Sequence, residues 1–192
     1  MKIGVLASQG AFAEHIAVLE QLDTEAVPVR LPRELKGVDG LIIPGGESTT
    51  ISRLMSASDL MKEVADRGRE GMPLFGTCAG MILMAREVSG NGTASLGLMD
   101  IRVRRNAFGR QVDSFETTLS IPVLGEKPFP GIFIRAPLIE HCQGGVEVLA
   151  RLEDGTAVAA RQGKLLVAAF HPELTTDLRF HRYFLDIAAG ER

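Results

Sequence analysis

The sequence has little cysteine, little net charge and no long apolar run at its start. Its two cysteines, Cys78 and Cys142, are too few for a disulfide scaffold, so we expect two reduced thiols in an intracellular protein. The net charge of −3, from 21 basic and 24 acidic residues, supplies no overall field for nucleic acid or a membrane. The first apolar run is too short to span a membrane, and Glu14 follows too soon for a signal peptide. These absences favour a cytoplasmic protein that recognises its partners locally.

Two phosphate-binding motifs are also missing. The segment ASQGAFAEH has no G-x-G-x-x-G, and PGGESTT lacks the Gly-Lys-Ser/Thr ending of a phosphate loop. We therefore predict no dinucleotide site, and no other cofactor or metal.

The first half of the chain repeats one pattern. A short apolar run gives way to glycine or a small polar residue and then to helical periodicity, in residues 2–22, 40–55 and 72–88. Residues 24–31 add a further strand. Continuous apolar strands followed by helices predict a parallel sheet covered on both faces.

The second half changes character. Residues 114–124 and 145–152 alternate partly and predict antiparallel strands, residues 153–173 predict two strands joined at Gly163-Lys164, and residues 177–189 predict a closing helix. Short links leave no domain boundary in 192 residues. We predict a single α/β domain over residues 1–192, with one mixed, mostly parallel sheet and helices on both faces.

Cys78 lies in GTCAG, between a strand expected to end at Phe75 and a helix expected to begin near Ala79. This G-x-C-x-G pattern is the thiol form of the nucleophile elbow. The helix N-terminus favours the thiolate, and N–H groups beginning with that of Ala79 are suited to hold an oxyanion. The alternative is that Cys78 is a small buried hydrophobic residue.

His171 is the histidine best placed to serve a nucleophile. It follows the apolar run LLVAAF, at a strand end where active sites of open α/β sheets collect. In an extended segment Glu173 points the same way, so it is suited to hold one imidazole nitrogen while the other faces a thiol.

The other histidines are weaker candidates. We predict His181 on a helix surface and His15 on an amphipathic helix face. His141 beside Cys142 is a competing pair, but sequence neighbours point apart, and EHCQGG is typical of an exposed turn.

The segment LIIPGGESTT places paired glycines after a strand, with Ser48 and Thr49 as candidate helix caps. It is either a tight turn with an N-cap or a cradle of backbone N–H groups for an anion.

Together PGGES, GTCAG and FHPE, in that order, resemble the class I glutamine amidotransferase family, whose Cys-His-Glu triad releases ammonia from glutamine. GVLASQGAFAEHI, GGESTT, RRNAFGRQVDSFE, GIFIRAP and AFHPELT narrow the resemblance to the glutaminase subunits of pyridoxal 5′-phosphate synthase. These segments extend from Gly4 to Thr175.

The resemblance implies a flavodoxin-like class I glutamine amidotransferase fold and L-glutamine as substrate. It implies a catalytic triad of Cys78, His171 and Glu173, with Gly46 and Ala79 as oxyanion donors. It also implies substrate-binding residues at Gly46, Glu47, Ser48, Arg105, Ile134 and Arg135. Ser8 departs from the apolar residue that is common in this family.

The implied partner is a separate synthase subunit, which condenses a pentose phosphate, a triose phosphate and ammonia into pyridoxal phosphate. The implied assembly is a large hetero-oligomer with one glutaminase per synthase subunit and a glutaminase that is weak or silent alone. Two other classes stay open: a peptidase-like thiol enzyme with a related fold, and a binding module that keeps the triad only as a relic.

Arg105 lies among Arg102, Arg104 and Arg110. Such a cluster is either a solvated strand face or a patch for phosphate or nucleic acid, and the acidic total charge disfavours the patch. We favour Arg105 as a contact to the substrate carboxylate or as an ordering element of the pocket, with the other arginines at the surface or at the partner interface.

Overall fold

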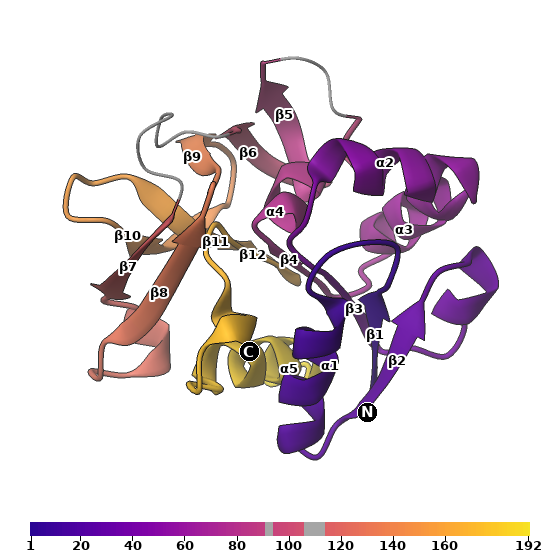
Figure 1. Ribbon diagram of the computed structural model, residues 1–192, viewed down its shortest axis with the longest axis horizontal. Helices are drawn as coiled ribbons and strands as arrows, with labels where there is room; N and C mark the ends of the chain where they lie inside the picture. Colours follow the sequence, from indigo (N-terminus) through magenta and orange to yellow (C-terminus); the bar gives the residue numbers. More distant parts are fainter. Residues whose placement is uncertain (91–93, 106–113) are drawn as a thin grey trace.

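The computed structural model describes residues 1–90, 94–105 and 114–192, and its largest element is a sheet of ten strands (Figure 1). The strand order is β2-β1-β3-β4-β12-β11-β9-β6-β5, and β10 also pairs with β11. In chain order the strands are β1 (Lys2–Leu6), β2 (Glu25–Val29), β3 (Gly40–Ile43), β4 (Leu74–Thr77), β5 (Ala85–Ser89), β6 (Met99–Arg104), β9 (Leu138–Cys142), β10 (Glu147–Arg151), β11 (Ala157–Gln162) and β12 (Leu165–Ala168).

The sheet divides into a parallel and a mixed part, as predicted. Strands β2, β1, β3, β4 and β12 run parallel to one another, and β3 and β4 are buried at every position. Such continuous apolar runs suit central strands that are covered on both sides. Strands β11, β9 and β6 then pair antiparallel, and β5 pairs parallel with β6 at the far edge.

Helices cover both faces of the sheet, and β4 shows which helix covers which face. The Phe75 ring packs against Phe180 and Phe184 of α5 (Arg179–Ala189), with ring centroids 5.5 Å apart in each case. The next residue, Gly76, faces the opposite side and lies against Gly80 and Met84 of α4 (Ala79–Met84). Figure 1 shows α1 (Phe12–Gln21) beside α5, and α2 (Ser48–Ala57) and α3 (Leu60–Arg69) on the side of α4.

Within the described ranges, no helix has both the length and the apolar character needed to cross a membrane.

A second, two-stranded sheet lies beside the first, where the sequence had predicted one sheet. It pairs β7 (Ser114–Leu119) antiparallel with β8 (Phe129–Ile134), and the chain between them contains the short 3-10 turn η2 (Pro122–Leu124). Phe115 and Phe133 stack with ring centroids 4.6 Å apart. The His171 N–H donates to the Ile132 carbonyl at 2.8 Å, which joins this hairpin to the segment after β12.

Two local predictions were wrong. The helix expected over residues 81–88 ends at Met84, because the next five residues form β5 and pair with β6. The exposed turn expected at EHCQGG begins only after Cys142, because the three residues before Gln143 belong to β9. In both places strand pairing decided the local structure, which a short apolar pattern cannot reveal. The α3 helix was not predicted.

Gly80→Ala tests the close packing of α4 on β3. A Cβ at position 80 would overlap the Ile43 carbonyl oxygen, so α4 would have to move. We expect a loss of about 3 kcal/mol in the free energy of unfolding, or roughly 6 to 12 °C in melting temperature. Gly71→Ala is the matched control: its Cβ meets open space, and only its φ of +95° should cost about 1 kcal/mol. Equal losses in denaturant titrations of the two variants would contradict the packing.

Candidate active site

Cys78 occupies a sharp turn between β4 and α4, as its motif predicts. Its backbone has φ of 48° and ψ of −103°, a strained conformation for a residue with a Cβ. The Cys78 N–H donates to the Ala168 carbonyl of β12 at 2.8 Å, so the elbow is attached to the neighbouring strand. The strand β4 continues to Thr77, two residues beyond the expected end at Phe75. The thiol side chain is 8% exposed, which leaves it accessible from one side.

His171 and Glu173 contact one another, as predicted, but the backbone between them has a different conformation from the one expected. His171 Nδ1 lies 2.7 Å from Glu173 Oε1, and both side chains are buried. The expected extended segment is instead a 3-10 turn, η3 (Pro172–Leu174), which begins after His171. Pro172 fixes φ at the first position of this turn and needs no N–H partner there.

The charge state of His171 is set by its two neighbours. Burial lowers its pKa, but the hydrogen bonds with Cys78 and with Glu173, together with the negative charges of both groups, raise the pKa to about 10. The imidazolium therefore persists through neutral pH and is lost only as the pH rises through that value. A thiolate beside an imidazolium is the reactive form of a catalytic cysteine.

A pocket of about 470 Å³ opens at this thiol and contains nearly the whole predicted site. Its walls are Gln9, Gly46, Glu47, Ser48, Cys78, Ala79, Ile82, Arg105, Ile134, Arg135 and His171. Glu173 lies behind His171, away from the pocket. Ile82 was not predicted. Gln9 lies in the segment SQG, Ser8 to Gly10, which the family resemblance places next to the active-site mouth, and it follows the end of β1, where loops of open α/β sheets meet at one edge.

Glu47, and not Ser48 or Thr49, caps helix α2, which corrects the predicted cap. Its carboxylate accepts hydrogen bonds from the N–H groups of Thr49 at 3.0 Å and Thr50 at 2.7 Å. The side-chain hydrogen bond from Thr50 is the largest cause that lowers the pKa of Glu47 to about 2. Arg105 Nη2 lies 3.4 Å from the same carboxylate, so Arg105 and Glu47 order each other at the pocket wall.

The glycines of PGGES bring bare backbone against the catalytic groups. Gly46 has φ of +155°, and Gln9 Oε1 accepts the next N–H, that of Glu47, at 2.8 Å. A Cβ at Gly45 would overlap the His171 ring, so glycine is required there by the histidine. On the other side of the thiol, the Ala79 N–H is the first of α4 and has no partner one turn earlier in the helix.

The end of β8 supplies the remaining pocket wall. Cys78 Sγ lies 3.9 Å from the Ile134 carbonyl oxygen. Arg135 has φ of 42°, so the chain turns sharply beside the pocket. Ile134 is 37% exposed, which is unusual for a large apolar side chain next to a buried site.

The arginine cluster is only partly described. Arg102 pairs with Glu87, and Arg104 lies 3.5 Å from Glu140, so both belong to the exposed face of β6. Arg110 and most of the RNAFGRQVDSFE signature lie in residues 106–113, outside the described residues.

Two further histidines are fully buried behind the triad. His181 of α5 was predicted on a helix surface, and that prediction was wrong, because its Nε2 is buried 2.9 Å from Nδ1 of His15, which was predicted on an amphipathic helix face. Burial is the largest cause that lowers the pKa of His15 well below its ordinary value, and electrostatic repulsion from His181 and His171 lowers it further. Burial lowers the pKa of His181 to about 3, so both rings are neutral.

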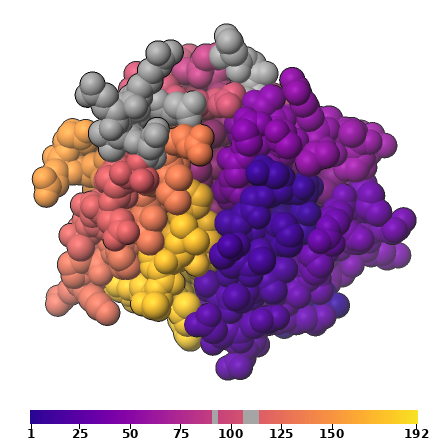
Figure 2. All heavy atoms as spheres, viewed as in Figure 1, coloured from indigo at the N-terminus to yellow at the C-terminus, as the bar shows by residue number. Residues whose placement is uncertain are grey.

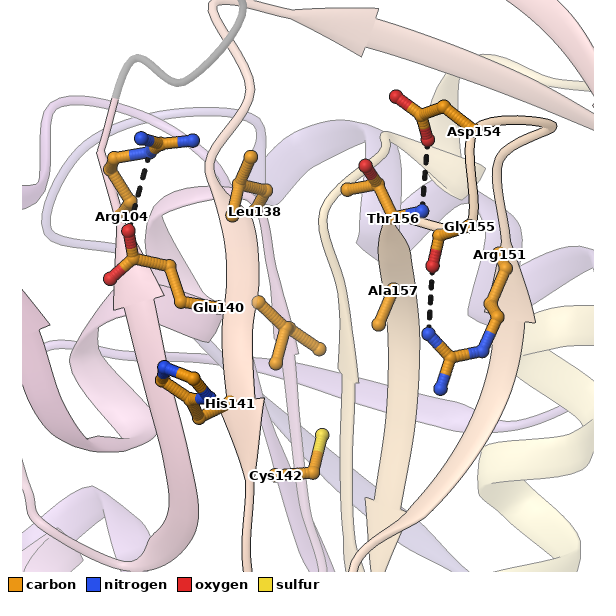
Figure 3. Close-up of a pocket in the computed structure, with 11 residues that line it drawn as sticks. Arg104, Leu138, Glu140, His141, Cys142, Arg151, Asp154, Gly155, Thr156 and Ala157 are labelled. Carbon is orange, nitrogen blue, oxygen red and sulfur yellow. Dashed lines mark hydrogen bonds and ion pairs between the residues drawn. The ribbon is translucent and has the colours of Figure 1, made fainter.

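The competing Cys/His pair has no such geometry. Figure 3 shows the side chains of His141 and Cys142 on different sides of β9, as predicted for sequence neighbours. Both cysteines are free, and partial burial raises the pKa of Cys142, which opposes the thiolate.

A second hollow, of about 610 Å³, lies between β9 and the β10–β11 hairpin (Figure 3). It contains none of the predicted site residues. Its charged groups already have partners within the chain: Arg104 contacts Glu140, and Arg151 donates to the Gly155 carbonyl at 2.7 Å.

The comparisons with known proteins agree with this geometry. The chain is 59% identical over 193 residues to "Pyridoxal 5′-phosphate synthase subunit PdxT" of Pelotomaculum thermopropionicum, covering 100% of this chain and 98% of that one. It is 60% identical to the protein of the same name from Dehalococcoides mccartyi, covering 98% and 97%. A solved structure, "Crystal structure of glutamine amidotransferase", superposes with a TM-score of 0.93 at 51% identity, covering 97% and 98%. The chain belongs to the SNO glutamine amidotransferase family, whose model matches residues 5–189.

The imidazolium of His171 predicts that Cys78 is a reactive thiol at neutral pH. In a Cys142→Ala background, which removes the other thiol of the chain, we expect iodoacetamide to alkylate Cys78 rapidly at pH 7, because His171 keeps its positive charge until the pH rises through about 10. His171→Asn removes the positive charge and should slow alkylation at pH 7 by about tenfold. His141→Asn is the control and should leave the rate unchanged. Equal rates for His171→Asn and its parent would refute the ion pair.

Proposed function

We propose that the protein hydrolyses L-glutamine to L-glutamate and ammonia through a Cys78, His171 and Glu173 triad. The observation that carries the proposal is the buried 2.7 Å contact between His171 and Glu173, directly behind a strained elbow cysteine that opens into a pocket. Membership of the SNO glutamine amidotransferase family supports glutamine as the substrate.

The first half of the reaction forms a thioester. The Cys78 thiolate adds to the carboxamide carbon of glutamine, and the carbonyl oxygen becomes an oxyanion. His171 then transfers its proton to the amide nitrogen, the carbon–nitrogen bond breaks, and ammonia leaves. A γ-glutamyl thioester remains on Cys78.

The second half releases glutamate. Neutral His171 takes a proton from water, and the hydroxide adds to the thioester carbon. The carbon–sulfur bond breaks, which restores the thiolate and the imidazolium. Glu173 accepts the Nδ1–H throughout, so the other ring nitrogen stays directed at the reacting atoms.

The oxyanion is held by the backbone N–H groups of Gly46 and Ala79. These residues lie on opposite walls of the pocket, one before α2 and one at the start of α4. The Cys78 N–H already donates to the Ala168 carbonyl, so the oxyanion donor on this side of the pocket is the Ala79 N–H. Each donor that is aligned with the oxyanion contributes about 3 kcal/mol to the transition state.

The ammonia passes to a synthase subunit that condenses it with a pentose phosphate and a triose phosphate into pyridoxal 5′-phosphate. The names of the relatives, which are subunits of that synthase, support this partner. The proposal includes a large hetero-oligomer with one glutaminase per synthase subunit, and a cytoplasmic location. The exposed Ile134 at the pocket mouth offers an apolar contact for such a partner.

Glutamate release by the purified chain, alone and with a pyridoxal phosphate synthase subunit added, tests the proposed activity. We expect release to appear or rise sharply with the synthase subunit. Cys78→Ala should lower it by at least about a thousandfold, because the nucleophile is lost. Cys142→Ala, the other cysteine of the chain, should keep the parental rate. Appreciable release by Cys78→Ala would sink the mechanism, and no release by the parent would point to another acyl substrate or a binding role.

Arg105→Ala tests the substrate-binding side of the pocket. Loss of the guanidinium removes a charged group suited to the α-carboxylate of glutamine and leaves the Glu47 carboxylate held by Thr49 and Thr50 alone. We expect KM for glutamine to rise about tenfold, with a smaller change in kcat. Arg102→Ala removes a cation from the exposed face of β6 and should leave both constants unchanged. If Arg105→Ala behaves like Arg102→Ala, Arg105 has no role in the pocket.

A further inference from the structure

The second oxygen of the Glu173 carboxylate is not explained by the triad. Oε1 accepts from His171, whereas Oε2 is buried and has no hydrogen-bond partner within ordinary limits. A buried carboxylate oxygen that lacks a donor is costly. His15 Nε2 of helix α1 lies 3.4 Å from this oxygen.

The partners of His15 fix where its proton lies. Its Nε2 faces Glu173 Oε2 and Thr77 Oγ1, and the carboxylate can only accept, so Nε2 carries the hydrogen. Because burial keeps His15 neutral, its Nδ1 must then accept a hydrogen bond. His181 Nε2 lies 2.9 Å from that Nδ1 and is therefore the donor.

The same assignment accounts for the other buried nitrogen. Neutral His181 with hydrogen on Nε2 leaves a bare lone pair on Nδ1, which is the buried nitrogen without a partner. An unpaired buried acceptor is more common than an unpaired buried donor. The result is a chain with one direction: His181 donates to His15, and the His15 Nε2–H donates to Thr77 Oγ1 at 3.1 Å while it also faces Glu173 Oε2 at 3.4 Å. Glu173 already accepts from His171 through its other oxygen.

Within the described ranges, the polar groups that contact the His15 ring all belong to this arrangement. Thr77 approaches from β4, Glu173 from η3 and His181 from α5, and the Phe75 ring meets the imidazole edge-on at 6.2 Å. Thr77 Oγ1 also accepts the Gly45 N–H at 3.1 Å. The ring of His15 therefore touches groups that adjoin both the catalytic carboxylate and the glycine pair before α2.

We propose that His15 is a positioning residue for glutamine hydrolysis, which holds the Glu173 carboxylate and, through it, the ring of His171. This inference rests on the proposed function. His15 lies behind Glu173 and does not reach the pocket, so it acts through another residue and not on the substrate. His181 fixes the tautomer of His15 from the opposite helix. Figure 2 shows the N-terminal and C-terminal segments side by side on the molecular surface.

Loss of His15 would remove the N–H group that faces Glu173 Oε2, so the hydrogen bond from His171 to Oε1 would be the contact that still orients the carboxylate. The carboxylate and the His171 ring could then rotate together. Misplacement of a catalytic group by about 1 Å costs on the order of a hundredfold in rate. The thiolate–imidazolium pair would also weaken, because its positive member depends on Glu173.

Two substitutions at one position separate the donor from the volume. His15→Leu removes every polar atom of the side chain. His15→Gln places an amide N–H close to the position of the lost Nε2–H and restores the donor. Val18→Ala is the matched control, because Val18 is buried on the same helix and has no polar side-chain atom. All three are made in the full chain and assayed with the synthase subunit.

We expect His15→Leu to lower kcat by about ten- to a hundredfold with KM changed less than about twofold. His15→Gln should recover most of the lost rate. Val18→Ala should reduce the melting temperature but leave kcat at the parental value. In a Cys142→Ala background, iodoacetamide should alkylate Cys78 at pH 7 about threefold more slowly in His15→Leu, and at the parental rate in Val18→Ala.

The outcomes separate this inference from the proposed function. If the parent releases glutamate and folded His15→Leu has the same kcat and the same rate of Cys78 alkylation, the positioning role is wrong and the function stands. If His15→Gln is as impaired as His15→Leu, the ring matters only for packing, and the role is again overturned.

If the parent releases no glutamate, the proposed function fails, and the rate of Cys78 alkylation still tests the link from His15 to Cys78. Should His15→Leu not fold, His181→Leu and His15→Gln decide the question by the same two readouts, with a rate deficit in His181→Leu required.

Discussion

The placement of β12 beside β4 is the constraint on which the site depends. In this parallel pair Ala168 is opposite Thr77, and the Ala168 carbonyl accepts the Cys78 N–H. The nucleophile elbow and the start of the segment that leads to His171 are therefore joined by the backbone ladder itself. Because side chains alternate along a strand, a slip of one residue would turn Thr77 to the opposite face and separate it from His15. The positions of the triad residues therefore depend on the β4–β12 register, and apolar residues buried on both faces of the sheet fix that register.

The glycines around the thiol allow the helix, the sheet and the catalytic groups to pack closely together. Gly76 and Gly80 bring α4 down onto the sheet, and Gly45 gives the His171 ring the space that a side chain would occupy. Gly46 adopts a backbone angle that residues with a Cβ rarely take. The strain at Cys78 is held by these contacts, because the elbow has β12 on one side and α4 on the other. A rigid frame of this kind reduces the reorganisation that the reaction needs.

The sequence was sufficient to predict the parallel units, the elbow cysteine and the contact of His171 with Glu173, because each of these depends on local pattern. It was insufficient wherever pairing or burial decided the outcome. His181 was predicted on a helix surface, but it is buried, and burial of a neutral imidazole is acceptable when another imidazole accepts its hydrogen. The cap of α2 was assigned to serine or threonine by preference, whereas the longer Glu47 side chain reached back to two N–H groups. The two-stranded sheet depends on long-range pairing that no single segment encodes.

The first and last helices of the fold meet behind the catalytic carboxylate, and this has a consequence for the order of events during synthesis. Chains are synthesised from the N-terminus, and domains generally fold as units. The elbow cysteine and the glycine pair leave the ribosome before β12, η3 and α5, so the thiol exists for a time without its histidine and without the helix that supports it. A chain that ends before β12 has the nucleophile but neither of the groups that complete the triad. The completed triad therefore depends on the last part of the chain to be synthesised.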